Sequence, residues 1–283
     1  MNMSKINPIA LLREFNLTPK KGLGQSFLID DNFLRRIVSA AEITRQDAVL
    51  EIGAGLGSLT QHLAEAAGQV VTVELDRDFL PVLQKVLGEK SNVQVIQGNI
   101  LKLDPSILMK KKGYLVVANV PYYITSTLLR HLLEARFKPA RLVLTVQREV
   151  AQRICALPGK MSRLALSVQV YGNPKPVLKI PASAFYPQPK VNSTTIRIDL
   201  YPQPLISENL LDAFFKLINA GFSQKRKMLH NALSKGLCLP HEEVNTLLRL
   251  AVINPKRRAQ TLTIEEWNQL AGIYEEKYGG LDS

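Results

Sequence analysis

The sequence contains little cysteine, little histidine and no long apolar run. Its two cysteines, Cys155 and Cys238, lie far apart without metal-binding spacing, which argues against a disulfide framework and favours a reducing compartment. The four histidines also lack ligand spacing, so we expect no metal. No segment approaches the roughly 18 apolar residues that cross a bilayer, and the N-terminal residues lack the apolar core of a signal peptide. We therefore expect a cytoplasmic protein that does not associate with a membrane.

Acidic residues are also in the minority. The 283 residues include 36 lysines and arginines against 24 acidic residues, which gives a net charge of +12. Such an excess favours an anionic partner, nucleic acid first and a membrane surface second, although solubility alone is another explanation. Hydrophobic residues make up 46% of the chain, enough for a packed core.

Short apolar runs alternate with amphipathic segments in the first half of the chain. We expect strands over residues 49–52, 70–73, 93–96, 114–117 and 142–146, and helices over residues 31–43, 59–67, 79–87 and 126–134. Near-continuous apolar strands separated by helices indicate a parallel sheet that is buried on both faces. The fold class is therefore α/β.

The pattern changes after this region. Residues 164–171 and 194–200 resemble strands that can form an antiparallel edge, and the segment 174–189, with five prolines, is expected to be mostly loop or extended chain. Helices are expected over residues 209–220, 225–234, 241–250 and 264–274. We predict a catalytic domain of residues 1–203 and a small all-α domain of residues 204–283.

A glycine loop joins the first expected strand to the following helix. In VLEIGAGLGSLT, Gly53, Gly55 and Gly57 occupy every second position, where glycine permits a sharp turn and close approach to a ligand. The spacing differs from the dinucleotide motif G-x-G-x-x-G. The loop is headed by Glu51, which suits a cationic or neutral nucleoside better than a pyrophosphate.

Polar residues end the next strands. Glu74 can bind both hydroxyls of a ribose, and Asn99 and Asn119 end two further strands. Because the carboxyl ends of parallel strands share one edge of the sheet, we expect Gly53, Glu74, Asn99 and Asn119 to converge. A tight turn explains the glycine loop alone, but not the three polar strand ends.

These motifs together resemble a known family. VLEIGAGLGSLT, VELD, GNI and NVPYYITS resemble motifs of Rossmann-like S-adenosylmethionine-dependent methyltransferases, and more narrowly of the KsgA/RsmA-type rRNA adenine dimethyltransferases. KKGLGQSFLID resembles the N-terminal cofactor motif of that family, and VQREVAQRI, AFYPQPKVNSTTIRI, FSQKRKMLHNAL and RAQTLTIEEWNQLA resemble its later motifs. The resemblance extends over about residues 13–275.

The resemblance implies a methyl donor, a substrate and a set of site residues. The donor is S-adenosylmethionine, without a metal, and the substrate is 16S rRNA, free or in the 30S subunit or its precursor. Two adjacent adenosines in the loop of the 3′-terminal hairpin each receive two methyl groups on N6. We expect a monomer. The cofactor-binding residues implied are Ser26, Leu28, Gly53, Glu74, Asn99 and Asn119.

Two of these residues depart from the family pattern. The family commonly has asparagine where this chain has Ser26, whose hydroxyl can still bind polar groups of the cofactor but has a shorter reach. It usually has aspartate where this chain has Asn99. An amide oxygen can also accept a hydrogen bond from the adenine amine, but we expect the loss of charge to weaken that contact.

The stretch NVPY, residues 119–122, predicts how the target adenine is held. The side-chain oxygen of Asn119 and the carbonyl of Val120 can each accept one N6–H, and Pro121 directs the turn. Tyr122 provides a face for stacking, and the resemblance assigns the opposite face to Phe185. No general base is needed before transfer. Without the cofactor motifs, a strand-terminating turn would explain this stretch equally well.

Basic clusters are candidates for RNA contact. We select Lys225, Arg226 and Lys227 because they begin an expected helix of the second domain, although a charge run is more often a solvated face. Other clusters are residues 20–21, 110–112 and 256–258.

Other functions remain to be weighed against this one. An erythromycin-resistance-type methyltransferase of large-subunit rRNA is a close alternative, which the resemblance over the full chain disfavours. A non-catalytic RNA-binding or transcription factor is a second alternative, which the presence of Glu74 and Asn119 disfavours. The glycine spacing argues against a NAD-dependent dehydrogenase.

Overall fold

The computed structural model describes residues 7–88, 90–224 and 226–279. The chain divides into two compact units, one of Met1–Ala151 with Asn173–Leu200 and one of Gln152–Gly172 with Tyr201–Ser283. The second unit includes Gln152–Gly172, a segment that the sequence placed in the first domain. The domain division after residue 203 stays a prediction.

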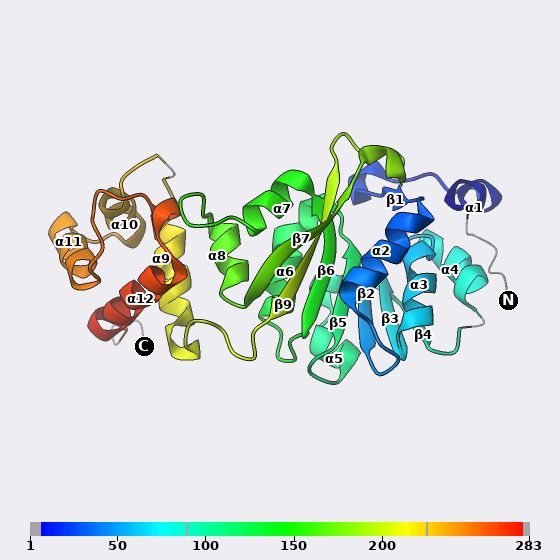
Figure 1. The fold of residues 1–283 in the computed structure, drawn as a ribbon, viewed down its shortest axis with the longest axis horizontal. Coiled ribbons are helices and arrows are strands. Elements are labelled where there is room, and N and C mark those ends of the chain that lie inside the picture. The colour runs from blue at the N-terminus through cyan, green and yellow to red at the C-terminus, as the bar shows by residue number, and fades with distance from the viewer. Residues whose placement is uncertain (1–6, 89, 225, 280–283) are drawn as a thin grey trace. The chain divides into compact units, whose positions relative to one another are not determined.

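A seven-stranded sheet forms the centre of the first unit (Figure 1). The strand order is β4-β3-β2-β5-β6-β9-β7, in which the first five strands are parallel and β9 is antiparallel to β6. The strands are β2 (Ala48–Ile52), β3 (Gln69–Glu74), β4 (Val93–Gln97), β5 (Leu115–Asn119), β6 (Arg141–Gln147), β7 (Gly172–Ile180) and β9 (Ser193–Leu200). The predicted α/β fold with an antiparallel edge is therefore confirmed.

Burial follows the position of each strand in the sheet. All residues of the central strand β2 are buried, and β5 is buried as far as Ala118. The prediction of burial on both faces is wrong for β4, whose residues are all at least partly exposed. The reason is that β4 is an edge strand with one neighbour.

Helices cover both faces of the sheet. Figure 1 shows α2 (Asp31–Ala41), α3 (Ser58–Ala66) and α4 (Leu80–Leu87) on one face and α5 (Pro105–Met109) and α6 (Thr125–Leu133) on the other. Val49, Leu63, Val70 and Val117 belong to the core between α3 and the sheet. The first unit also contains α1 (Pro8–Glu14), the 3₁₀ turns η1 (Lys21–Leu23), η2 (Arg77–Phe79), η3 (Ile100–Lys102), η4 (Tyr122–Ile124) and η5 (Ala182–Ala184), and the strand pair β1 (Phe27–Leu28) with β8 (Phe185–Tyr186).

One predicted strand is a helix. Residues 164–171 alternate apolar and polar letters, but α8 (Arg163–Gln169) occupies this region. The side chain of Ser162 accepts a hydrogen bond from the backbone N–H of Ala165 at 3.1 Å, which is an N-cap that starts a helix. The edge strand is β7 instead, which begins two residues before the segment 174–189 predicted to be mostly loop or extended chain and overlaps its first part.

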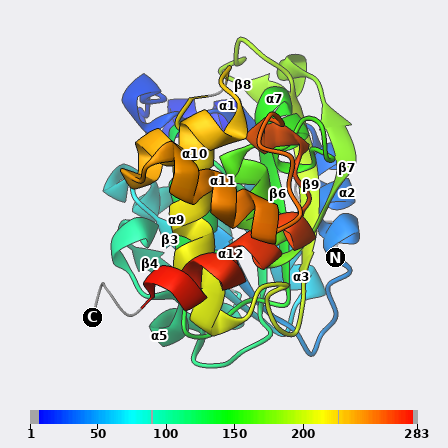
Figure 2. The same ribbon diagram turned by 90° about the vertical axis from the view of Figure 1, so that its left-hand side faces the viewer.

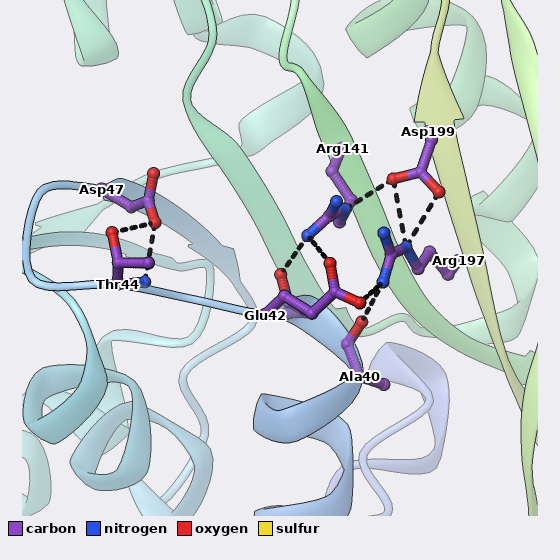
Figure 3. A network of polar contacts seen from close by, with 8 residues as sticks. Ala40, Glu42, Thr44, Asp47, Arg141, Arg197 and Asp199 are labelled. Atoms are coloured by element: carbon purple, nitrogen blue, oxygen red, sulfur yellow. Dashed lines mark hydrogen bonds and ion pairs between the residues drawn. The ribbon is translucent and has the colours of Figure 1, made fainter.

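An ionic network joins the C-terminus of α2 to the antiparallel strands (Figure 3). Asp199 accepts from Arg141 at 2.6 Å and from Arg197 at 2.9 Å, and both arginines pair with Glu42. The same guanidinium groups donate to the carbonyls of Ala41 and Ala40. The network therefore holds β6, β9 and α2 together.

The second unit is helical. It contains α9 (Leu211–Gly221), α10 (Leu229–Leu237), α11 (His241–Leu250) and α12 (Ile264–Tyr278), together with α8 and the 3₁₀ turns η6 (Glu208–Leu210) and η7 (Ala259–Thr261); α7 (Arg148–Ile154) spans the division between the units. Figure 2 shows α10, α11 and α12 gathered beside α9. The fully buried Trp267 of α12 packs against Gly221, where an added Cβ would lie 2.7 Å from the indole. The predicted helix over residues 225–234 begins later, at Leu229.

Candidate active site

A cavity of about 220 Å³ lies in the first unit, at the carboxyl ends of β2, β3, β4 and β5. Its lining includes all the residues predicted for the cofactor and the target base, which come from distant parts of the chain. They are Ser26, Leu28, Gly53, Glu74, Asn99, Asn119, Val120, Pro121, Tyr122 and Phe185. The structure therefore brings the predicted residues together, while their individual roles remain predictions.

The glycine loop between β2 and α3 has a backbone that favours glycine. Gly53, Gly55 and Gly57 have φ angles of 80°, 54° and 80°, which side chains rarely adopt. A Cβ on Gly53 would find no atom closer than the Asn119 backbone oxygen at 3.9 Å, whereas one on Gly55 would lie 3.0 Å from the Phe27 ring. Gly53 thus leaves open space beside its peptide, and Gly55 permits the Phe27 ring to pack closely against the loop.

Glu74 at the end of β3 is held by backbone donors. Its Oε2 accepts from the Gly55 N–H at 2.8 Å and its Oε1 from the Asp76 N–H at 2.7 Å. Burial raises the pKa of Glu74, and these N–H groups oppose that shift. Each oxygen keeps a second lone pair with which it can accept a hydrogen bond from a ligand hydroxyl.

Asn99 caps the 3₁₀ turn that follows β4. Its side-chain oxygen accepts from the backbone N–H of Leu101 at 3.0 Å, and the residue is half-buried in the cavity wall. The amide oxygen expected to meet the adenine amine therefore already accepts one hydrogen bond and keeps one further lone pair for a ligand.

The segment before β1 is tied to the segment after β8. Ser26 donates its hydroxyl hydrogen to the Pro187 carbonyl at 2.8 Å, so the hydroxyl can offer a ligand only its lone pairs. Leu28 is buried and pairs with Phe185 in the β1–β8 register. Phe185 exposes 3% of its surface, which leaves little ring face for a base.

The side chain of Asn119 has a defined orientation. Its Nδ2 donates to the Ser26 carbonyl at 3.1 Å, a bond that only the nitrogen can make. Its Oδ1 therefore faces away from that carbonyl, and neither this oxygen nor the Val120 carbonyl has a hydrogen-bond donor among the residues that the structure describes. Two acceptors on adjacent residues are thus available at one wall of the cavity.

The turn after Asn119 positions two aromatic rings differently. Pro121 has φ −56° and ψ 129° and precedes η4. The Tyr122 hydroxyl lies 2.9 Å from the hydroxyl of the buried Ser193, which fixes the tilt of the ring. Tyr123 is 61% exposed and packs beside Gly24.

An ionic cluster fastens the N-terminal segment next to Glu74. Lys20 bonds Asp76 at 2.8 Å and Asp78 at 2.7 Å, and Gln25 donates to Asp76 at 2.7 Å. The hydrogen bond to Asp76 is the main cause that raises the pKa of Lys20. One of the basic clusters considered for RNA contact therefore has its first lysine committed to an internal contact.

Two residues of the glycine-loop region differ from the sequence interpretation. Glu51 does not line the cavity; it is 1% exposed, and its Oε2 accepts from the Thr60 hydroxyl at 2.6 Å. The idea that it faces a ligand is wrong, because β2 directs its side chain into the core. Ser58, which belongs to the motif VLEIGAGLGSLT but was not predicted as a site residue, lines the cavity, and its buried hydroxyl has no hydrogen-bond partner within the described part of the chain. Its only sequence signal was its place after Gly57.

The predicted RNA-binding residues belong to the second unit. Lys225 lies outside the described residues. Arg226 and Lys227 are exposed in the turn before α10, and the described residues include no acidic partner for them. Arg257, from another basic cluster, is instead paired with Glu266.

Neither a metal cluster nor a membrane span is found in the part of the chain that the structure describes. Within residues 7–88, 90–224 and 226–279, no group of three or more His, Cys, Asp or Glu side chains is placed to hold a metal ion. Across the same residues, no helix combines the length and apolar character that a membrane crossing requires.

Comparisons with known proteins agree with the geometry. The family model described as "Ribosomal RNA adenine dimethylase" matches residues 16–276. Relatives named ribosomal RNA small subunit methyltransferase A include those of Dehalococcoides mccartyi, 44% identical over 94% of this chain and 92% of the relative, and Alkaliphilus oremlandii, 41% identical over 94% and 96%.

Solved structures agree as well. A dimethyladenosine transferase from Plasmodium falciparum has a TM-score of 0.76 at 26% identity, over 88% of this chain and 97% of that chain. The 23S rRNA methyltransferase ErmE has a TM-score of 0.70 at 26% identity, over 87% and 98%. The chain belongs to the ribosomal RNA adenine dimethylase family.

Proposed function

We propose that this protein transfers methyl groups from S-adenosylmethionine to N6 of two adjacent adenosines, two methyl groups each, in the 3′-terminal hairpin loop of 16S rRNA. The observation that carries the proposal is the pair of free acceptors, Asn119 Oδ1 and the Val120 carbonyl, at the wall of the cavity. Family membership and the names of the relatives support it. In this proposal the enzyme acts as a cytoplasmic monomer in the biogenesis of the small subunit.

The cavity fits the proposed methyl donor. Gly53 offers a bare peptide with open space, Ser58 an unpartnered hydroxyl, and Glu74 lone pairs suited to ribose hydroxyls. Ser26, Leu28, Asn99 and Asn119 complete the cofactor residues that we propose. The bound cofactor supplies an electrophilic methyl group on a sulfonium.

The protein's own contribution is the orientation of the target amine. Asn119 Oδ1 and the Val120 carbonyl each accept one N6–H, which directs the nitrogen lone pair away from them and toward the cofactor. Tyr122 stacks on the base, a contact worth roughly 1–3 kcal/mol, and Phe185 closes the cavity behind it. Transfer breaks the S–CH3 bond and gives a cationic amine, which releases one proton to water; one N–H then remains, so only one acceptor is engaged in the second transfer.

The target base must leave its stack to enter this site. Extrusion costs a few kcal/mol in a duplex and less in a loop, which favours a hairpin loop as substrate. Lys225, Arg226 and Lys227 are proposed to contact RNA phosphates, which position the RNA without reading its sequence.

The test uses undermethylated 30S subunits and 16S rRNA incubated with tritiated S-adenosylmethionine, followed by nucleoside analysis. We expect label in N6,N6-dimethyladenosine, at four methyl groups per rRNA. A folded enzyme that leaves both substrates unlabelled would refute the proposal. A parallel incubation with 23S rRNA tests the activity named for ErmE, which the shared fold makes the second candidate.

Asn119→Ala tests the acceptor pair. Removing one positioned polar group of an active site commonly lowers kcat by roughly a hundredfold or more, and we expect such a loss in a variant that still binds S-adenosylhomocysteine. Asn173→Ala is the matched control, because Asn173 is exposed on β7 and lies outside the cavity. Normal turnover by Asn119→Ala would exclude the proposed role of its oxygen.

A further inference from the structure

Tyr123 lies at the mouth of the cavity with most of its ring exposed. It lines the cavity together with Tyr122, but 61% of its surface is exposed, whereas Tyr122 is half-buried and its hydroxyl contacts the buried Ser193. Both tyrosines belong to the 3₁₀ turn η4. Because a 3₁₀ helix has three residues per turn, consecutive side chains point in different directions. The turn therefore directs one ring toward the interior and the next toward solvent.

The exposed ring is supported on one side. The Ile124 N–H donates to the Pro121 carbonyl at 3.2 Å, which closes the turn that carries Tyr123. A Cβ added to Gly24 would lie 3.5 and 3.6 Å from two carbons of the Tyr123 ring and 3.4 Å from Pro121. The Tyr123 hydroxyl has no hydrogen-bond partner among the residues that the structure describes. The ring thus rests against the N-terminal segment and leaves its remaining surface free for a ligand.

A basic residue belongs to the same supporting segment. The Gly24 N–H donates to the Lys21 carbonyl at 3.0 Å, which closes η1 beside the Tyr123 ring. Lys21 is exposed and, unlike Lys20, has no carboxylate partner within the described part of the chain. Sites for single-stranded nucleic acid combine cations that follow the backbone with aromatic rings on which bases stack. A single exposed tyrosine is ordinary on a protein surface, but a supported ring at a cavity mouth, close to an unpaired lysine, has the features of such a site.

The connectivity of the RNA indicates which base would meet this ring. This step rests on the proposed function. An extruded nucleotide stays joined to its neighbours through its phosphates, so when one adenosine of the pair occupies the cavity, the other must lie outside it, at the mouth. We infer that Tyr123 stacks on this neighbouring adenosine and holds it while the first is methylated. The contact adds affinity for the RNA and does not touch the reacting atoms.

Methylation kinetics on undermethylated 30S subunits and 16S rRNA give the first test. Tyr123→Leu keeps an apolar side chain but removes the ring, and the loss of one base stack weakens binding by roughly 5- to 150-fold. We expect the KM for RNA to rise by such a factor, with kcat within about threefold of the wild type, because the stack is equally present before and during transfer. Tyr123→Phe retains the ring and should have the wild-type KM. Ile107→Ala is the control, because Ile107 is 70% exposed on α5 and lies outside the cavity. A wild-type KM for Tyr123→Leu would overturn the inference, whereas a wild type that methylates neither RNA refutes the proposed function.

Hairpin RNAs with one abasic residue separate stacking from an indirect effect of the substitution. One adenosine of the pair is kept and the other is replaced by an abasic residue, on the 5′ side in one RNA and on the 3′ side in the other. For the wild type bound to S-adenosylhomocysteine, one of the two replacements should weaken RNA binding by roughly fivefold or more. For Tyr123→Leu the same replacement should change the affinity by less than about twofold, because ring and base act as a pair. Replacements that affect both enzymes equally would overturn the inference, even if Tyr123→Leu raises the KM.

Discussion

Replacing Glu51 with glutamine is expected to stabilise the first unit at pH 8 and to have little effect at pH 4. Glu51 lies in the central strand β2 at 1% exposure, and its Oε1 has no hydrogen-bond partner within the described residues. Burial raises the pKa of this carboxyl from 4.5 to about 7. Near neutral pH the folded protein must therefore either keep the Glu51 carboxyl protonated or bury its negative charge.

The direction of the pH dependence follows from these two values. Below pH 4.5 the carboxyl is protonated in both the folded and the unfolded state, so its ionisation does not lower the free energy of unfolding. As the pH rises toward 7 the unfolded chain releases a proton that the folded chain keeps, so stability falls. The difference between 4.5 and 7 corresponds to about 3 kcal/mol at pH 8 and about 2 kcal/mol at pH 6.

Glutamine removes this cost because it is neutral at every pH. It can still accept from the Thr60 hydroxyl through its oxygen, and its amide group faces Thr72, the register partner of Glu51 on β3. The free energy of unfolding of Glu51→Gln should thus exceed that of the wild type by about 3 kcal/mol at pH 8, and the difference should vanish near pH 4.

Urea unfolding at pH 4, 6 and 8 measures this difference. Circular dichroism follows the whole chain, while the fluorescence of Trp267, the one tryptophan of the sequence, reports the second unit. Glu149→Gln is the control, because Glu149 is an exposed acid of the first unit. If Glu51→Gln and the wild type keep a constant difference at all three pH values, the argument from burial is refuted.

Three other changes test separate parts of the structure. Tyr122→Phe loses the hydroxyl contact with Ser193 and should lower kcat by about three- to tenfold without changing the affinity for S-adenosylhomocysteine; an unchanged kcat would show that the contact does not position the ring. Arg226→Ala with Lys227→Ala should reduce the slope of log binding constant against log salt by about 1 to 2, and an equal slope would remove both residues from the RNA surface. Asp199→Asn should lower the free energy of unfolding by about 1 kcal/mol, and the loss should shrink in 1 M salt; a loss insensitive to salt would contradict an ionic role.

The sheet and its polar edge could be predicted because each depends on local sequence. Buried parallel strands require continuous apolar runs. The polar residue that follows each run therefore lies at the edge of the sheet formed by the carboxyl ends of the strands. Glu74, Asn99 and Asn119 could therefore be assigned to one cavity before any contact was known. The same reasoning failed for residues 164–171, since a helix of only seven residues fits alternating apolar letters as well as a strand does, and the N-cap at Ser162 was the deciding signal.

Contacts between distant segments could not be predicted in this way. The bond from Ser26 to Pro187 joins residues 161 positions apart, and the bond from Lys20 to Asp76 joins residues 56 apart. The periodicity of apolar and polar residues does not indicate which distant carbonyl or carboxylate a side chain will contact. From the sequence, Ser26 was expected to bind the cofactor and Lys20 was only one member of a basic cluster, whereas the structure commits the donor groups of both to the protein itself.

These distant contacts give the N-terminal segment a part in orienting both halves of the site. The Ser26 carbonyl holds the amide nitrogen of Asn119, and this bond is what leaves the Asn119 oxygen free for a target amine. The same segment binds Asp76 through Gln25, and the Asp76 N–H holds Glu74. A reaction that depends on alignment needs its two binding groups fixed relative to each other. Residues 20–26 supply that link between the strand that ends in Glu74 and the strand that ends in Asn119.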